Sequence, residues 1–216
     1  TVDLKAGCCS VFGYDNNVSG FESTCIGTYN ECHGSYSFCG GFECKTEGQT
    51  SIAFGHYSEA TGSCSVALGW ESKAKGDQSF AIGYYAEAPE YNAIAMGYYA
   101  KAKSTESVAI GSYNEANDYQ SLALGAHSIA SGYNSIAIGY YAKTSSIYQT
   151  AMGKFNIEDT EGKYALIFGG GEYSTPKNIF TLDWNGNAWF AGSVTDGNGA
   201  TLDGVELEDS GILTSS

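Results

Sequence analysis

The chain has 216 residues and a formal net charge of −14, with 24 acidic residues against ten basic ones. All ten basic residues are lysines and they form no cluster, so binding to nucleic acid or to an anionic membrane is not expected. No apolar run reaches the roughly 18 residues of a membrane span. No signal-peptide pattern begins at Thr1, and the missing initiator Met suggests a fragment or a processed product.

A glycine recurs every 14 residues along most of the chain, and most of these anchor glycines close a Ser-bulky-Ala-bulky-Gly phrase, as at residues 51–55 and 107–111. Alternating small and bulky residues stopped by glycine predict a short strand and a turn. A second strand and a second turn, commonly with glycine, complete each period. The pattern predicts an all-β solenoid of 14-residue coils, each with two strands of about five residues. The anchors are Gly13, Gly27, Gly41, Gly55, Gly69, Gly83, Gly97, Gly111, Gly125, Gly139 and Gly153.

Side chains alternate between the two faces of a strand, so the alanine two places before each anchor faces away from the bulky residues beside it. A second alanine row, at Ala60, Ala74, Ala88, Ala102, Ala116 and Ala130, alternates with outward Glu, Lys and Tyr. The two rows are predicted to face each other across a thin lumen that admits little beyond Ala, Ser, Cys or Thr.

The bulky residues then point out of their own coil and form an apolar stripe larger than soluble monomers usually expose. Burying each of them contributes roughly 1.5 to 3 kcal/mol, so the chain is expected to be an obligate oligomer, hypothesised as a homotrimer. The predicted interface consists of Ile52, Phe54, Val66, Leu68, Phe80, Ile82, Ile94, Met96, Val108, Ile110, Leu122, Leu124, Ile136 and Ile138.

Four places after each anchor, the charge alternates from coil to coil with one interruption at Ile129. Stacked coils lie about 4.8 Å apart, so alternating charges attract where like charges would repel. The series favours parallel, in-register stacking. Its members are Glu31, Lys45, Glu59, Lys73, Glu87, Lys101, Glu115, Ile129 and Lys143.

Seven cysteines lie in the first third of the chain, and Cys25, Cys32 and Cys39 occupy predicted inward positions. An odd number without a CxxC pair argues against a disulfide framework and a zinc site. We expect free thiols that pack as small apolar groups, which favours assembly in a reducing cytosol. A disulfide ladder between stacked cysteines is the alternative.

The period fails after Gly153. Residues 163–169 still resemble a coil displaced by two residues, and the three glycines at 169–171 are expected to break the chain. Two alternating apolar runs then flank Asn185-Gly186, the sequence of a type I′ hairpin turn in which both central residues have positive φ.

Counted from this turn, Phe180, Leu182, Trp184 and Trp189 share one face of the hairpin. A hairpin of this size is not stable alone, so we expect it to cap the solenoid and to join three chains there. The predicted organisation is a repeat head over 1–157, a transition with an aromatic hairpin cap over 158–195, and a polar linker or tail over 196–216.

The repeat, with Ser-Val-Ala-Ile-Gly followed by Tyr-x-Ala-x-Ala, resembles the head repeat of YadA-like trimeric adhesins from about Ser10 to Gly153. This resemblance implies a left-handed parallel β-roll, trimerisation and attachment to a host surface, and it supplies no catalytic residue. The early coils depart from the pattern, with Val11 in the alanine position and Gly40 in place of a bulky residue, so irregular first coils are expected. The segment 180–192 resembles tail-fibre and other tail proteins of phages and prophages.

No nucleophile elbow, phosphate loop or HExxH motif occurs, and the three histidines are scattered. We expect the acidic residues Glu158, Asp159 and Glu161 to lie in a solvated loop. Residues 183–187 imitate the start of a calcium loop, but Ala188 stands in place of its glycine. We therefore expect no metal, no cofactor and no catalysis.

An outward row of aromatic residues follows the anchor glycines. Stacking between coils is its simpler interpretation, and contact with a receptor glycan is the alternative. The candidate receptor-binding residues are Tyr57, Trp70, Tyr85, Tyr99, Tyr113 and Tyr141.

The sequence favours a structural or receptor-binding segment of a trimeric phage or prophage tail fibre, in the virion tail, that attaches to a host cell-surface glycan or protein. The alternative is the head of a trimeric adhesin on a bacterial cell surface. A polysaccharide-degrading tailspike is a third reading, but it needs a pair of carboxylates in a groove, and here each Glu of the charge series alternates with Lys.

Overall fold

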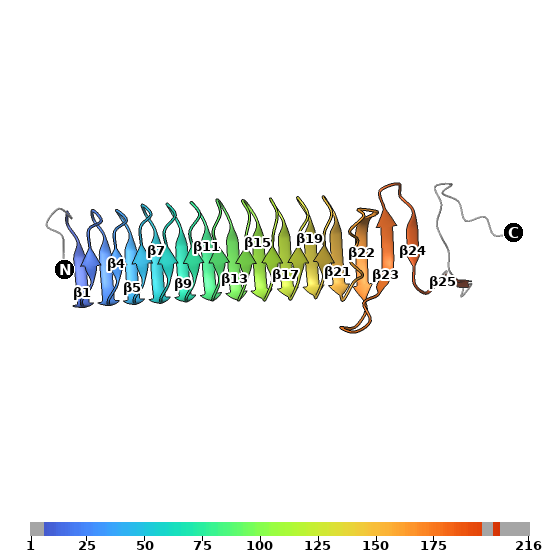
Figure 1. Ribbon diagram of the computed structural model, residues 1–216, viewed down its shortest axis with the longest axis horizontal. Coiled ribbons are helices and arrows are strands. Elements are labelled where there is room, and N and C mark those ends of the chain that lie inside the picture. The colour runs from blue at the N-terminus through green and yellow to red at the C-terminus, as the bar shows by residue number, and fades with distance from the viewer. Residues whose placement is uncertain (1–6, 196–200, 204–216) are drawn as a thin grey trace.

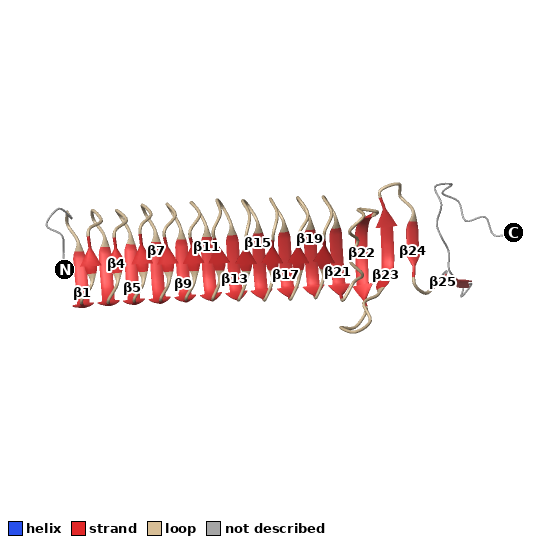
Figure 2. Cartoon of the chain, viewed as in Figure 1, coloured by secondary structure: helices blue, strands red, loops and turns tan. Residues whose placement is uncertain are grey.

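The computed structural model describes residues 7–195 and 201–203, and every regular element in these ranges is a β-strand. There is accordingly no helix among the described residues that could cross a membrane. The strands wind into an elongated parallel solenoid (Figure 1 and Figure 2). The predicted all-β solenoid of 14-residue coils is confirmed.

One wall of the solenoid consists of five-residue strands that pair in parallel and in register. Ala81, for example, pairs with Ala67 on one side and with Ala95 on the other. Even the first coils follow this register, so the irregularity expected there is wrong. The strands are β1 (Ser10–Tyr14), β3 (Thr24–Thr28), β5 (Phe38–Phe42), β7 (Ile52–His56), β9 (Val66–Trp70), β11 (Phe80–Tyr84), β13 (Ile94–Tyr98), β15 (Val108–Ser112), β17 (Leu122–Ala126), β19 (Ile136–Tyr140) and β21 (Thr150–Lys154).

The opposite wall has strands of only two residues, so the predicted length of about five is wrong for this wall. The other residues form two turns per coil, and each turn contains a non-glycine residue with positive φ, such as Tyr99 (54°) and Glu106 (56°). The strands are β2 (Asn17–Val18), β4 (Glu31–Cys32), β6 (Lys45–Thr46), β8 (Glu59–Ala60), β10 (Lys73–Ala74), β12 (Glu87–Ala88), β14 (Lys101–Ala102), β16 (Glu115–Ala116), β18 (Ile129–Ala130) and β20 (Lys143–Thr144).

The core is the narrow lumen between the two walls, and it contains small side chains. Both alanine rows, including Ala67 and Ala74, are completely buried, as predicted. Cys25, Cys32 and Cys39 also lie in the lumen. The hydrogen bond between the Cys25 and Cys39 thiols, together with burial, raises the pKa of Cys39. The three cysteines pack as small side chains in the lumen, as expected, and all seven cysteines of the chain are free.

A third luminal row, three residues after each anchor, is absent from the sequence-based prediction. Its polar members donate hydrogen bonds to backbone carbonyls. Asn114 Nδ2 donates to the Gly125 carbonyl of the next coil at 2.8 Å, and Ser72 Oγ donates to the Gly83 carbonyl at 2.7 Å. Such bonds satisfy buried carbonyls inside the tube. The row is Asn16, Asn30, Cys44, Ser58, Ser72, Ala86, Ala100, Asn114, Ser128, Ala142 and Asn156.

The anchor glycines are required because neighbouring coils come very close there. Gly97 has a φ of 128°, a conformation that residues with a side chain rarely adopt. A Cβ on Gly97 would also lie 2.0 Å from the Gly111 carbonyl oxygen of the next coil. The same approach recurs at every anchor, which explains the unbroken glycine period.

The charge series lies on the outer face of the two-residue strands, where neighbouring coils place opposite charges side by side. Lys101 Nζ lies 3.6 Å from Glu87 Oε2, and Lys73 Nζ lies 3.8 Å from Glu59 Oε1. The in-register stacking that the alternation predicts is confirmed.

After the last regular coil, β22 (Tyr164–Gly170) pairs in parallel with β21 and aligns Gly169 with Gly153. The predicted displacement of two residues is therefore confirmed. β22 includes Gly169 and ends at Gly170, and Gly171 lies outside any strand, so the chain breaks within this run of glycines, as expected. A Cβ at Gly170 would lie 2.5 Å from Cγ2 of Ile179 in the neighbouring strand, so the Ile179 side chain would have to shift.

The predicted hairpin is present and consists of β23 (Asn178–Asp183) and β24 (Ala188–Phe190), which extend the first wall antiparallel to β22. The turn differs from the type I′ prediction, because Gly186 has positive φ (90°) and Asn185 does not. Asp183 Oδ1 accepts hydrogen bonds from the backbone N–H groups of Asn185 and Asn187, both at 2.9 Å. These bonds stabilise a longer loop and lower the pKa of Asp183.

The longer loop shifts the strand pairing by one residue and reverses the face of Trp189. Leu182 pairs with Ala188, and Trp189 pairs with Thr181. The prediction that Trp189 shares a face with Phe180 and Leu182 is therefore wrong.

Two short strands follow the hairpin, β25 (Ser193–Thr195) and β26 (Thr201–Asp203), and they pair with each other as a separate antiparallel ribbon. The predicted polar linker over 196–216 lies outside the described residues except for β26.

Replacing Gly97 by alanine is expected to destabilise the protein by at least about 2 kcal/mol, because both φ and the Gly111 carbonyl oppose a Cβ. Denaturant unfolding at fixed protein concentration measures this loss. The matched control is Gly192→Ala, where a Cβ would meet nothing within 4 Å. Equal stability of both variants would contradict the close-approach explanation.

Replacing Lys101 by glutamate places three carboxylates side by side, because Lys101 pairs with Glu87 and Glu115. The melting temperature is expected to fall, and to fall more at low salt than at 1 M salt, because exposed charges are screened. Thermal melts at both ionic strengths, with Lys101→Gln as the uncharged control, measure the effect. A loss that does not depend on salt would show that the charge series contributes nothing to stacking.

Candidate functional site

The predicted interface residues all lie on the outer face of the first wall, on either side of the buried alanine row. None of the fourteen is buried within its own chain. Phe54 is 51% exposed and Phe80 is 40% exposed, although both carry large apolar rings. One long face of the solenoid is therefore apolar and open.

The apolar face continues beyond the regular coils into the hairpin. Leu166 and Phe168 align with outward positions of β21. Phe168 contacts Phe180 with ring centroids 5.7 Å apart, and Phe180 contacts Phe190 at 4.8 Å. The hairpin thus presents the same face as the coils, although its sequence lacks their period.

The aromatic residues form two ladders along the turns that follow the anchor glycines. The first ladder stacks nearly parallel rings over six coils, with centroid separations of 4.4 to 5.2 Å. A positive φ of 44° to 56° recurs at each of its positions, so every coil directs its ring the same way. This ladder contains Tyr85, Tyr99, Tyr113, His127, Tyr141 and Phe155.

The second ladder occupies the preceding position of each turn and contains Phe42, His56, Trp70, Tyr84 and Tyr98. His56 and Trp70 are its closest pair, with centroids 3.9 Å apart and planes within 9°. Two of the three histidines of the chain, His56 and His127, are thus members of aromatic stacks.

Five of the six candidate receptor-binding residues belong to these ladders, and Tyr57 packs edge-on against His56 at 4.3 Å. Neighbouring rings cover the ring faces of the ladders, so edges and hydroxyl groups point to solvent. The Tyr85 hydroxyl donates to Glu71 Oε1 at 2.6 Å, which raises the pKa of Tyr85 to about 12. The geometry therefore shows stacking between coils, the simpler of the two interpretations.

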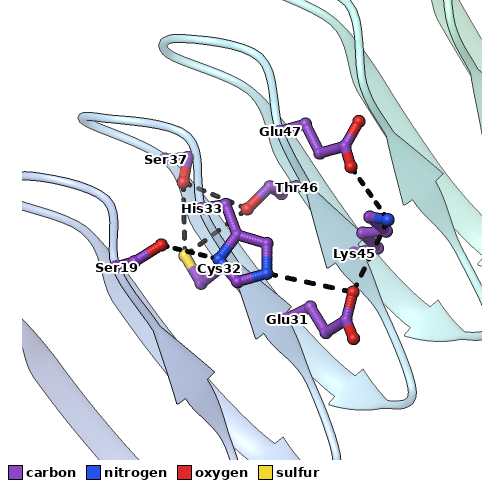
Figure 3. Close-up of polar contacts among 8 residues, drawn as sticks. All are labelled: Ser19, Glu31, Cys32, His33, Ser37, Lys45, Thr46 and Glu47. Carbon is purple, nitrogen blue, oxygen red and sulfur yellow. Dashed lines mark hydrogen bonds and ion pairs between the residues drawn. The ribbon is translucent and has the colours of Figure 1, made fainter. Parts of the chain in front are cut away.

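The third histidine belongs to a polar cluster on the early coils (Figure 3). Ser19 Oγ lies 2.7 Å from His33 Nδ1, and Glu31 lies between His33 and Lys45. Lys45 also pairs with Glu47 at 2.8 Å, which raises the pKa of Lys45. The cluster is a local continuation of the charge series, and within the described ranges no group of His, Cys, Asp or Glu has a metal-binding arrangement.

The acidic segment at 158–161 is only partly the solvated loop expected. Asp159 is buried, and its Oδ2 accepts hydrogen bonds from Gln149 Nε2 at 2.9 Å and from the Tyr164 backbone N–H at 2.8 Å. Asp159 therefore fixes the irregular connection between β21 and β22. Glu158 and Glu161 are exposed, as expected.

The central coils match the model of a known protein family. A family model described as the YadA head domain repeat (2 copies) matches residues 47–72, 60–86, 88–114 and 116–145. A search of curated proteins returned no match. The coils of this solenoid are therefore similar to the YadA head domain repeat.

Proposed function

We propose that this chain is the head of a homotrimeric adhesin on a bacterial cell surface, where it contacts a glycan or protein of a host cell. The similarity of residues 47–145 to the YadA head domain repeat supports this function over the tail-fibre interpretation. The open apolar face supports a trimer, because its residues stay exposed unless other chains cover them. YadA-like heads are trimeric adhesins.

In the proposed trimer, the first walls of three chains face a common axis and bury the interface residues against one another. Ile52, Phe54, Phe80, Met96 and Ile110 are each 37% to 51% exposed in the single chain. Burial of each such side chain contributes roughly 1.5 to 3 kcal/mol, so the row stabilises association strongly. The aromatic hairpins extend the same face and join the three chains at their ends.

A phage or prophage tail fibre is the second candidate, and the aromatic hairpin favours it. The segment 180–192 resembles tail-fibre proteins, and a rigid trimeric shaft serves a virion tail equally well. In both readings the protein binds a surface and catalyses no reaction. Cell-binding assays with the intact trimer distinguish the two. An adhesin is expected to bind cells of the host that the bacterium colonises, whereas a tail fibre is expected to bind bacterial cells.

Replacing Ile110 by glutamate is expected to prevent trimer formation, because three carboxylates would then lie in an apolar interface. Multi-angle light scattering at micromolar concentration gives the mass directly. The control is Ile129→Glu on the opposite wall, where Glu115 and Lys143 already flank the position. A trimeric I110E variant, or a monomeric parent protein, would contradict the proposed interface.

The same pair of variants tests the adhesin role on glycan and matrix-protein arrays. The trimer is expected to bind at least 100-fold more tightly than the I110E chain, because three linked weak sites act together. Equal binding by the parent trimer and the I110E chain would show that attachment does not depend on several linked sites. Absence of binding to every host glycan and protein would count against the adhesin itself.

A further inference from the structure

The two ends of the solenoid are covered differently. At the C-terminal end, β22, β23 and β24 continue the first wall, and a cleft of about 590 Å³ beside Trp189 lies where the second wall has already stopped at β20. At the other end, β1 and β2 each pair with a single strand among the described residues. A coil with one neighbour makes fewer contacts than an inner coil, so the N-terminal coils are expected to open most easily.

Two cysteines of these coils are direct neighbours across the first wall. Cys25 in β3 and Cys39 in β5 pair in register, and both side chains are completely buried in the lumen. Neighbouring strands of a sheet lie about 4.8 Å apart, and a disulfide joins Cα atoms that are about 4.4 to 6.8 Å apart. The two thiols are therefore within reach of each other, and a hydrogen bond already joins them.

The other luminal cysteines have no cysteine beside them. Cys32, in the second wall, aligns with Val18 on one side and with Thr46 on the other. Its sulfur contacts hydroxyl groups, at 3.4 Å from Thr46 Oγ1 and 3.2 Å from Ser37 Oγ. Cys44 belongs to the polar luminal row, between an asparagine and a serine. No two cysteines of the chain other than Cys25 and Cys39 are 14 residues apart, so the register selects one pair.

We propose that Cys25 and Cys39 form a disulfide that joins the second and third coils and so stabilises the N-terminal end of the solenoid. The structure describes the dithiol form of this pair. The oxidant is itself a disulfide, carried by a small thiol compound or by a thiol oxidoreductase. Such oxidants occur where secreted and cell-surface proteins fold. Formation of the bond in the cell therefore rests on the proposed surface location, whereas the reactivity of the pair does not.

The bond forms by thiol–disulfide exchange in two steps. The Cys25 thiolate attacks one sulfur of the oxidant RS–SR, which gives a mixed disulfide and releases RS⁻. The Cys39 thiolate then attacks the Cys25 sulfur and releases the second RS⁻. The two thiol protons go to the two RS⁻ groups, so the cysteine pair loses two electrons and the oxidant is reduced to two RSH.

The structure also indicates the order of attack and the route of access. The hydrogen bond from Cys39 lowers the pKa of Cys25, which makes Cys25 the first nucleophile. Both thiols are completely buried, so the oxidant reaches them before the terminal coils have stacked or when these coils open. The disulfide then restricts further opening of the same coils.

Incubation of the full chain with oxidised glutathione tests this proposal. After the remaining thiols are alkylated, cleavage at glutamate separates the peptide 23–31, which contains Cys25, from the peptide 32–43, which contains Cys39. Mass spectrometry is expected to find these two peptides joined by a disulfide. Addition of glutathione to the exposed Cys64 is the control that the oxidant has acted.

Two variants assign the bond to its cysteines. Cys39→Ala is expected to abolish the link, whereas Cys32→Ala, which changes the other cysteine of the peptide 32–43, is expected to keep it. Alanine fills the row of Cys39 in the next coils, at Ala53 and Ala67, so Cys39→Ala is expected to fold as the parent does. Circular dichroism establishes this first, and Cys25→Ala is expected to give the same result as Cys39→Ala.

Limited proteolysis measures the effect on the N-terminal end. The oxidised parent is expected to be cleaved in its first three coils at least about tenfold more slowly than oxidised Cys39→Ala, because the cross-link limits local opening. The proposal is overturned if the two peptides stay unlinked although Cys64 carries glutathione, if folded Cys39→Ala keeps the link, or if both oxidised proteins are cleaved at the same rate. None of these outcomes bears on the trimer or on host attachment, which the light-scattering mass and the binding arrays test separately.

Discussion

Every feature of this molecule depends on stacking 14-residue coils in register, with backbone nearly touching backbone at the anchor glycines. A Cβ at Gly97 or Gly111 would lie about 2 Å from the carbonyl oxygen of the next coil. Once each glycine is aligned with the next, Ala81 lies over Ala95 and Glu87 lies beside Lys101. The lumen, the charge series and the aromatic ladders all repeat because this one register repeats.

The same constraint determines where function can reside. A coil this short leaves room for alanine, cysteine, serine and asparagine in its lumen, so the bulky apolar residues lie outside. An ordinary domain would bury Phe54 or Ile110 in its own core, but here each contributes to an open face. The solenoid is thus an elongated rod with one open apolar face. Its chemically varied residues are at the end, where the period stops.

The sequence predicts much of this structure because period and alternation are local signals. The buried alanine rows, the outward apolar residues and the in-register charges follow from counting alone. The turn at Asn185-Gly186 does not, because Asp183 accepts two backbone hydrogen bonds and so lengthens the loop by one residue. That single residue decides which face Trp189 occupies.

Other features escaped prediction because they depend on contacts between distant residues. From the sequence, Asp159 is predicted to be a solvated acid. In the structure, Gln149 and the Tyr164 backbone donate hydrogen bonds to it. The cleft beside Trp189 exists because the first wall is longer than the second. This difference in length could not be predicted from local sequence patterns. The polar luminal row could have been found, since Asn114 and Ser128 recur at the coil period beside the alanines.

Deleting whole coils tests the central claim most directly, because removal of 28 residues restores the register and removal of 21 does not. A chain lacking residues 80–107 joins Ser79 to Val108, keeps Lys73 next to Glu115, and is expected to fold cooperatively as a rod about 10 Å shorter. A chain lacking residues 80–100 places Lys101 where Phe80 stood and is expected to lose its β-structure beyond the junction. Circular dichroism with small-angle scattering measures both. Equal folding of the two variants, or collapse of the 28-residue deletion, would contradict in-register stacking as the basis of the fold.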